Sequence, residues 1–159
     1  MHHSGKRSVL ARALLPYYGY GMSKTPYLLD DQIGYLLRRV NQRHLAIFAD
    51  AIPQLTTTQF AALARLAQLG PQSQNLLGRE TAMDAATIKG VVERLSRQGL
   101  VSTAPDPNDR RRLTVSLTEA GALAYAKAMD AAFTVTEKTL APLTEDEAEV
   151  LHKLLQRMV

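Results

Sequence analysis

The chain has 159 residues, of which 46% are hydrophobic, enough to build the core of one domain and too many for a disordered chain. It contains no cysteine, which excludes disulfides, thiolate metal sites and cysteine-based redox sensing. The formal net charge is +4, but three of the 19 basic residues lie within residues 1–21, so an argument for nucleic-acid binding must rest on where the charges lie.

The N-terminal stretch shows no regular hydrophobic period. Residues 1–29 are interpreted as an extension, in part a tag remnant or residues upstream of the true start, and we expect little function in residues 1–21. The apolar run of residues 9–15 is short and interrupted by Arg12, which argues against a signal peptide. No apolar run approaches the roughly 18 residues of a membrane span, so no membrane partner is expected and a cytoplasmic location is compatible.

A long amphipathic helix is predicted from about residue 30 to residue 51. Asp30 and Asp31 are placed to cap its N-terminus and to favour the helix dipole, and Pro53 ends it. Its apolar stripe, which includes one histidine, repeats at helical spacing. The stripe residues are Ile33, Leu36, Leu37, Val40, His44, Ile47, Phe48 and Ala51.

Three shorter helices are predicted next, each preceded by a residue that can cap its first turn. The caps are Thr56 or Thr57, Ser73 and Asp84. Gly70-Pro71 ends the first of these helices, and Gly99 ends the third, which spans residues 85–98. A short turn separates the second helix from the third, which is typical of a helix-turn-helix.

Two strands joined by a basic loop follow that pattern. They are expected near residues 100–104 and 112–117, and the second alternates apolar and polar side chains as a half-buried strand does. Prolines, an asparagine and an aspartate supply the turn chemistry between them. A basic hairpin beside a helix-turn-helix is the geometry of a winged helix, so nucleic-acid binding is the leading functional prediction.

Two further helices complete the chain. The first begins after Thr118, and the second is capped by Thr144 with Glu147 as its capping-box partner. The apolar face predicted for the first comprises Tyr125, Met129, Ala132, Phe133, Thr136 and Leu140, and that for the second comprises Val150, Leu151, Leu154, Leu155 and Met158. These faces must bury against something: packing between two chains of a homodimer is the favoured interpretation, and closure of a monomeric helical core is the alternative.

The DNA-binding hypothesis names residues of the helix-turn-helix. N-terminal residues of the second helix meet base edges in the major groove, so Ala85, Thr87 and Lys89 are candidates there. Ser73 and Gln74, at the start of the preceding helix, are candidates for phosphate contacts. The alternative is that Thr87 and Lys89 are merely solvated.

The loop between the strands carries the second group of candidates, Asp109, Arg110, Arg111 and Arg112. An arginine at a hairpin tip fits the narrow minor groove, where the negative potential is strongest. Asp109 lies two residues before Arg111 and can hold its guanidinium through a bidentate pair. The alternative is a solvated charge run or a bridge that only rigidifies the turn.

Several motifs together resemble those of a known family. They are Leu55-Thr56, Gln59-Phe60, Ser73-Gln74-Asn75-Leu76, Thr87-Ile88, Val91-Val92-Glu93-Arg94-Leu95, Gly99-Leu100-Val101, Asp106-Pro107-Asn108-Asp109-Arg110-Arg111 and Val115-Ser116-Leu117-Thr118-Glu119-Ala120-Gly121. Over roughly residues 33–159 the chain resembles the MarR family of bacterial transcription regulators. The resemblance implies an obligate homodimer, a palindromic operator in double-stranded DNA, and a small aromatic or phenolic ligand that weakens DNA binding. Asp109 and Arg111 match the family's wing pair, whereas Leu77 departs from the alanine common there.

His44 is the candidate for effector binding. A lone histidine on an apolar stripe is most often a satisfied core residue; the functional interpretation is a ligand-binding or pH-sensing group in a cleft. Arg38, Arg39 and Arg43 lie nearby on the same helix, and any of them can pair with a carboxylate. The hypothesis is an anionic aromatic effector, and residues 31–44 are similar to regulators of aromatic-acid or nicotinate catabolism within the family.

Two other functions compete with DNA binding as interpretations of the sequence. An enzyme is disfavoured because His44 and His152 are isolated, no metal-ligand cluster occurs and no glycine-rich phosphate loop is present; no cofactor and no metal are expected. A winged-helix protein-interaction module is the alternative. The predicted fold is mainly α with a small β-hairpin wing: a winged helix-turn-helix at residues 55–118 and a helical dimerisation region at residues 30–54 and 119–159.

Overall fold

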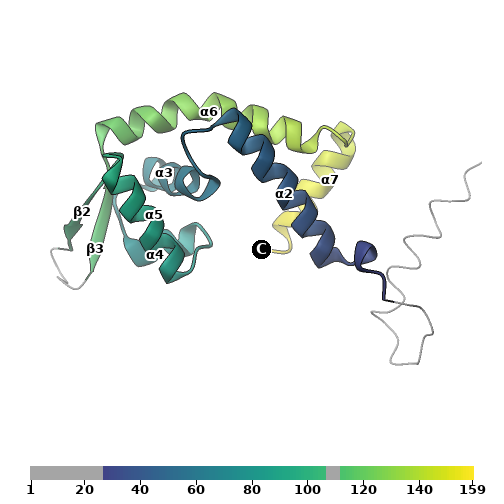
Figure 1. The fold of residues 1–159 in the computed structure, drawn as a ribbon, viewed down its shortest axis with the longest axis horizontal. Coiled ribbons are helices and arrows are strands. Elements are labelled where there is room, and N and C mark those ends of the chain that lie inside the picture. The colour runs from purple at the N-terminus through teal and green to yellow at the C-terminus, as the bar shows by residue number, and fades with distance from the viewer. Residues whose placement is uncertain (1–26, 107–111) are drawn as a thin grey trace, which may run out of the picture. The chain divides into compact units, whose positions relative to one another are not determined.

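The computed structural model describes residues 27–106 and 112–159 (Figure 1). These fall into two units, divided between Arg43 and His44, and each is considered by itself. The chain is mainly helical with a small antiparallel sheet, as predicted. Within the described residues, no helix is both long enough and apolar enough to span a bilayer.

The first long helix, α2, spans Ile33–Ala51 and ends before Pro53, close to the prediction. Its N-terminus differs from the prediction, because Asp30 and Asp31 lie in a separate 3-10 turn, Leu29–Asp31 (η2). Gln32 has an extended backbone between the two elements, and its carbonyl oxygen accepts the first helical hydrogen bond from Leu36 N at 2.9 Å. The two aspartates therefore precede the helix instead of capping it.

Three helices of the second unit begin at side-chain caps, because Ser, Thr and Asp oxygens can accept hydrogen bonds from the free N–H groups of a first turn. Helix α3 (Thr57–Leu69) is capped by Thr56, α4 (Gln74–Glu80) by Ser73 and α5 (Ala85–Arg97) by Asp84. Thr56 and Gln59 form a full capping box. Gly99, predicted as the left-handed stop of α5, has φ 71°.

The sheet has the strand order β1-β3-β2. Strands β2 (Val101–Pro105) and β3 (Leu113–Leu117) form the predicted hairpin, paired from Val101↔Leu117 to Pro105↔Leu113. Strand β1 (Gln72–Ser73) was not predicted; it pairs with the other edge of β3 through Gln72↔Val115 and Ser73↔Thr114. This pairing fixes the start of α4 against the base of the wing.

Helix α6 (Glu119–Leu140) begins after its cap Thr118, as predicted, and packs on the core partly through its predicted apolar face. Its buried residues are Gly121, Ala128 and Val135, with Tyr125 and Ala132 partly packed against the core. Met129 and Phe133, which belong to the same predicted apolar face, are exposed in the single chain. The small residues let the helix backbone lie near the Leu100 carbonyl, where a Cβ on Gly121 would clash.

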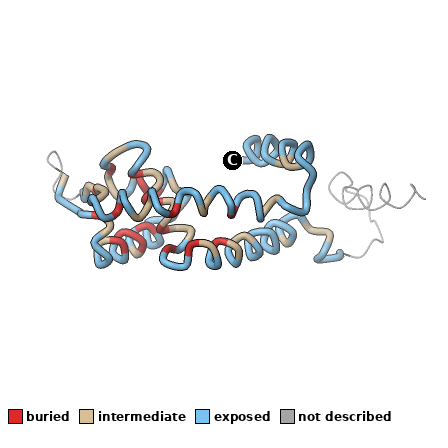
Figure 2. The backbone as a smooth tube through the Cα atoms, turned by 90° about the horizontal axis from the view of Figure 1, so that it is seen from above, coloured by how far each residue is buried: buried red, intermediate tan, exposed pale blue. Residues whose placement is uncertain are grey.

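The last helix, α7 (Glu145–Gln156), has the predicted capping box of Thr144 and Glu147. None of its residues is buried, and no red segment falls on it in Figure 2. The buried core gathers instead in the winged-helix part of the second unit, around residues from α3, α4, α5, the sheet and α6. Its fully buried side chains are Ile52, Leu63, Leu77, Ile88, Leu95, Val91, Val115 and Val135.

Candidate nucleic-acid interface

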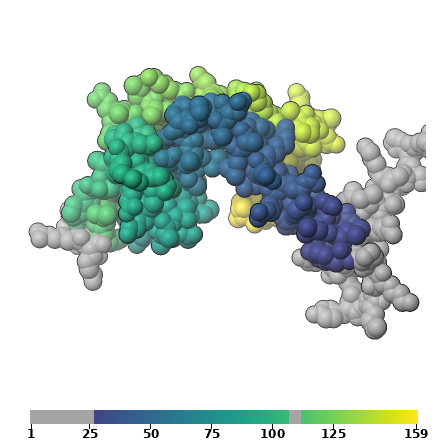
Figure 3. Space-filling view, viewed as in Figure 1, coloured from purple at the N-terminus to yellow at the C-terminus, as the bar shows by residue number. Residues whose placement is uncertain are grey.

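Helix α5 carries a buried face and an exposed face. Ile88, Val91, Val92 and Leu95 are buried against the core. The candidates Ala85, Thr87 and Lys89 are all exposed. Figure 3 shows the face of the molecule on which α4 and α5 lie. The core thus holds the helix while its N-terminal residues remain open to a ligand as large as DNA.

The first turn of α5 is ordered by Asp84. The Thr87 backbone N–H donates to Asp84 Oδ1 at 2.7 Å. This bond, together with one from the Thr87 side chain, holds the pKa of the Asp84 carboxyl below its usual value. Thr87 is itself exposed, so its hydroxyl and methyl groups are open to an approaching base edge.

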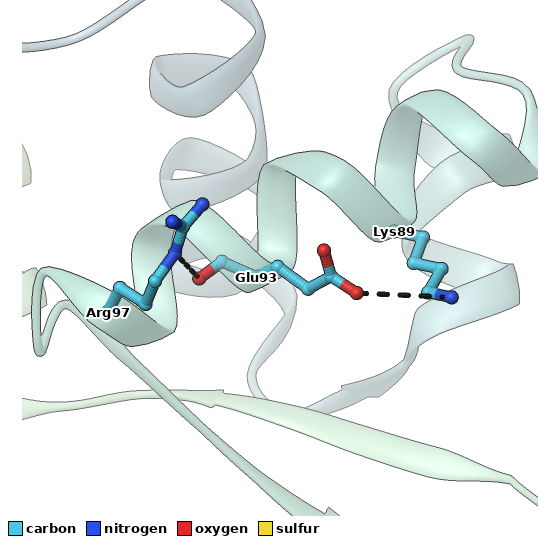
Figure 4. Close-up of polar contacts among 3 residues, drawn as sticks. All are labelled: Lys89, Glu93 and Arg97. Atoms are coloured by element: carbon cyan, nitrogen blue, oxygen red, sulfur yellow. Dashed lines mark hydrogen bonds and ion pairs between the residues drawn. The ribbon is translucent and has the colours of Figure 1, made fainter.

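Lys89 has an ion-pair partner that the sequence analysis missed. Its Nζ lies 3.9 Å from Glu93 Oε1, one helical turn further on, and both side chains are largely exposed (Figure 4). Arg97 Nε donates to the Glu93 backbone oxygen at 3.4 Å. The i,i+4 spacing of Lys89 and Glu93 was the signal available in the sequence. Such an exposed pair is weak, so a phosphate can replace Glu93 as the partner of Lys89.

The start of α4 and the base of the wing meet at Ser73. Ser73 Oγ accepts from Leu76 N at 3.3 Å as the helix cap and from Arg112 Nη2 at 3.5 Å. Gln74 lines the same small hollow of about 110 Å³ beside Arg112. The structure therefore brings together the phosphate candidates of α4 and one wing arginine, through the β1–β3 pairing that the sequence did not reveal.

The other wing candidates, Asp109, Arg110 and Arg111, lie outside the described residues, and so does the predicted pair of Asp109 with Arg111. In the described part of the hairpin, Asp106 N donates to the Arg112 carbonyl oxygen at 2.8 Å. A groove of about 540 Å³ runs between α5 and the strands. Its lining includes the charged side chains of Lys89, Glu93 and Arg97 on α5, together with the apolar side chains of Val92 and Leu113.

The effector candidates fall in both units. His44 Nδ1 lies 3.1 Å from Thr139 Oγ1, and its ring is 6.4 Å from that of Phe48. Arg38, Arg39 and Arg43 are exposed and belong to the other unit, where Arg39 lies 3.8 Å from Asp30. Within the described ranges, no cluster of three or more histidines and carboxylates could hold a metal ion.

Residues 55–113, the part that contains α3 to the start of β3, match the MarR family. The HTH-type transcriptional repressor NicR of Pseudomonas putida KT2440 is 42% identical over 140 residues, which is 87% of this chain and 89% of NicR. These relatives are transcriptional regulators and not enzymes.

Two solved structures share the fold, and their sequence identities to this chain are higher than or similar to that of NicR. A probable transcriptional regulator from Pseudomonas aeruginosa is 53% identical with a TM-score of 0.80, covering 83% of this chain and 100% of that one. Bordetella bronchiseptica BpsR, whose DNA binding is described as regulated by 6-hydroxynicotinic acid, is 38% identical with a TM-score of 0.80, covering 84% of this chain and 97% of BpsR.

Proposed function

Because the chain belongs to the MarR family of transcriptional regulators, we propose that it is a repressor that binds a pseudo-palindromic operator as a homodimer and leaves the DNA when a small aromatic acid binds. The observation that carries the proposal is the exposed N-terminal face of α5 beside a hairpin whose Arg112 contacts the cap of α4. Such a repressor acts in the cytoplasm, where the chromosome is.

In the proposed complex, α5 enters the major groove and the wing lies along the adjacent minor groove. Thr87 and Lys89 contact base edges, and Ala85 lets the helix sit close to them. Ser73 and Gln74 contact phosphate; the Ser73 oxygen already accepts two hydrogen bonds, so its hydroxyl hydrogen is available to a phosphate oxygen. Arg110, Arg111 and Arg112 supply the wing contacts, and Asp109 orients Arg111.

The proposed dimer buries apolar surface that one chain leaves exposed. On α7, Val150, Leu154 and Leu155 are 55%, 47% and 41% exposed, and Met158, just after the helix, is 66% exposed. Met129 and Phe133 of α6 are exposed as well. A two-fold interface covers the same patch on both subunits and places two recognition helices about one turn of DNA apart.

The proposed effector is an aromatic acid that contacts His44, with an arginine among Arg38, Arg39 and Arg43 pairing its carboxylate. BpsR, which responds to 6-hydroxynicotinic acid, supports this chemical class. His44 is half-buried next to the Phe48 ring, and Phe48, Phe60 and Tyr125 continue in ring contact at 5.8 Å and 5.6 Å. These aromatic contacts join α2 to α3 and α6. A ligand at His44 would therefore change the packing of the helices that support α5.

The test is fluorescence anisotropy of the full chain on the DNA upstream of its own gene, with a scrambled duplex as control. We expect tighter binding to the upstream DNA, a log affinity that falls linearly with log salt, and release by 6-hydroxynicotinate or a hydroxybenzoate. Equal, weak binding to both duplexes at every salt concentration would overturn the proposal and favour a protein-interaction module.

A further inference from the structure

His44 and Thr139 join two helices that are far apart in the sequence. His44 Nδ1 lies 3.1 Å from Thr139 Oγ1 across 95 residues, from α2 to α6. The same hydroxyl lies 2.7 Å from the backbone oxygen of Val135, one turn earlier on α6. Both His44 and Thr139 are half-buried. The two contacts together determine which atom of His44 carries hydrogen.

A threonine hydroxyl has one hydrogen to donate, and a backbone carbonyl oxygen can only accept. The Thr139 hydroxyl therefore donates its hydrogen to the Val135 backbone oxygen. Threonine often makes this hydrogen bond to the preceding turn of its own helix. Towards His44, Thr139 Oγ1 is consequently an acceptor, and Nδ1 must be the donor. A neutral imidazole carries only one N–H, so its Nε2 is left with a lone pair.

We infer that Thr139 is a positioning residue that fixes the Nδ1–H tautomer of His44, so that the effector must place a hydrogen-bond donor, a phenolic hydroxyl or a ring N–H, against Nε2. The inference rests on the proposed function, in which His44 contacts the effector. The two ends of the ligand are then recognised by different residues. A carboxylate has no hydrogen to donate to Nε2 and pairs with an arginine, whereas the donor group on the ring hydrogen-bonds to His44.

The same geometry sets specificity. An aromatic acid that lacks a donor leaves Nε2 without a partner in the complex, and sites built around a hydrogen bond discriminate against ligands that cannot make it. We expect hydroxylated acids to bind about tenfold more tightly than their methoxy or unsubstituted counterparts, the ratio for a hydrogen bond of ordinary strength.

The tautomer is tested first, without any effector. Two-dimensional NMR of the 15N-histidine-labelled full chain at about pH 8 distinguishes Nδ1–H from Nε2–H. Loss of one signal in H44F assigns His44 among the four histidines. We expect Nδ1–H in the unmodified protein and in T139S, and a shift towards Nε2–H in the nearly isosteric T139V. An Nε2–H signal in the unmodified protein, or no change in T139V, would overturn the inference.

The matched control is T134V. Thr134 is exposed on the same helix, and its hydroxyl donates to Asp130 O at 3.4 Å, so this variant removes a similar back-bond away from His44. We expect T134V to leave the His44 signal unchanged. If T134V shifts the tautomer as much as T139V does, the effect comes from the helix as a whole, and Thr139 has no special role.

The effector class is tested by calorimetry with matched ligands: 3- and 4-hydroxybenzoate against the methoxybenzoates, and 6-hydroxynicotinate against nicotinate. We expect the preference for the donor-bearing member to persist in T139S and to disappear in T139V. If no donor-bearing ligand binds more tightly than its counterpart, the donor requirement is wrong. Unchanged affinities in H44F would instead refute the effector part of the proposed function, and the NMR result on the tautomer would stand apart from it.

Discussion

Arg112 donates from Nη2 to Ser73 Oγ at 3.5 Å, which ties the base of the wing to the residue that caps α4. Both residues are candidates for DNA contact, although they lie far apart in the sequence. The contact means that α4 and the wing, the two elements that carry these candidates, are positioned together through β1 and β3. It also means that a loss of charge at Arg112 would mix two effects, a lost DNA contact and a released helix cap.

Arg111 is therefore the cleaner wing position to substitute. We predict that Arg111→Ala weakens operator binding by about 1–3 kcal/mol, the scale of one good groove contact. Arg97→Ala is a suitable control for the change in net charge, because Arg97 lies in the last turn of α5, away from its N-terminal residues. Gel shifts at fixed salt measure both. An unchanged affinity in Arg111→Ala would count against a wing that enters the minor groove.

Glu93 restrains the lysine that the proposal places near DNA. Its carboxylate lies 3.9 Å from Lys89 Nζ and adds a negative charge to the face of α5. We predict that Glu93→Gln tightens operator binding by a few tenths to about 1 kcal/mol and steepens its salt dependence, because no carboxylate then competes with the DNA for Lys89.

The control is Glu149→Gln. Glu149 pairs with Lys153 at 2.6 Å on α7, with the same i,i+4 spacing and the same change in charge, but far from α5 in the sequence. Anisotropy titrations over a salt series compare the two variants. Equal effects would mean that only net charge matters, and weaker binding in Glu93→Gln would show that Glu93 itself contributes to recognition.

Gly121 is the point at which α6 touches the backbone of the winged helix. A Cβ there would overlap the Leu100 carbonyl oxygen, which cannot move aside as a flexible side chain can. We predict that Gly121→Ala lowers the free energy of unfolding by about 1–3 kcal/mol. Gly34→Ala is the control, since nothing lies within 4 Å of its added Cβ and alanine favours the helix. Thermal unfolding of both variants is the measurement. Equal melting temperatures would show that a Cβ at position 121 does not clash with the Leu100 carbonyl oxygen.

The local features of the fold were predictable because they depend on neighbours in the sequence. The caps Thr56, Ser73, Asp84 and Thr144 each accept a hydrogen bond from an N–H three residues on, so short patterns predict them. The left-handed Gly99 was predictable for the same reason.

The features that sequence reasoning missed depend on distant partners. Strand β1 is only two residues long and exists through its pairing with β3, about 40 residues later. The contact of Gly121 with the Leu100 carbonyl was also missed, because the apolar pattern of α6 draws attention to larger side chains such as Met129 and Phe133. His44 was a candidate from its place on the stripe, but its partner Thr139 lies 95 residues away.

Asp84 makes the stability of the protein depend on pH. Hydrogen bonds from Thr87 lower the pKa of this carboxyl below its ordinary value of 3.8. A lowered pKa in the folded state means that the stabilisation is present at pH values above 3.8 and is lost as the pH falls through the folded-state pKa. We predict that Asp84→Asn melts at a lower temperature than the unmodified protein at neutral pH, and that the difference shrinks below about pH 4. A difference that stays constant down to pH 2 would show that the charge of Asp84 has no part in the cap.

The apolar face of α7 provides the test of the dimer. Leu154 is 47% exposed in one chain, and in a two-fold interface it would occur twice, once on each subunit. We predict that Leu154→Glu weakens the dimer by at least about 3 kcal/mol, because two carboxylates would be removed from water without partners. Leu69→Glu is the control, since Leu69 is 53% exposed at the end of α3 and lies outside the predicted dimerisation region. Sedimentation velocity at micromolar concentration distinguishes the outcomes: a dimer for the unmodified chain and Leu69→Glu, and a monomer for Leu154→Glu. If Leu154→Glu remains dimeric and still binds its operator, the chains associate through another surface, and the exposed face of α7 must be explained differently.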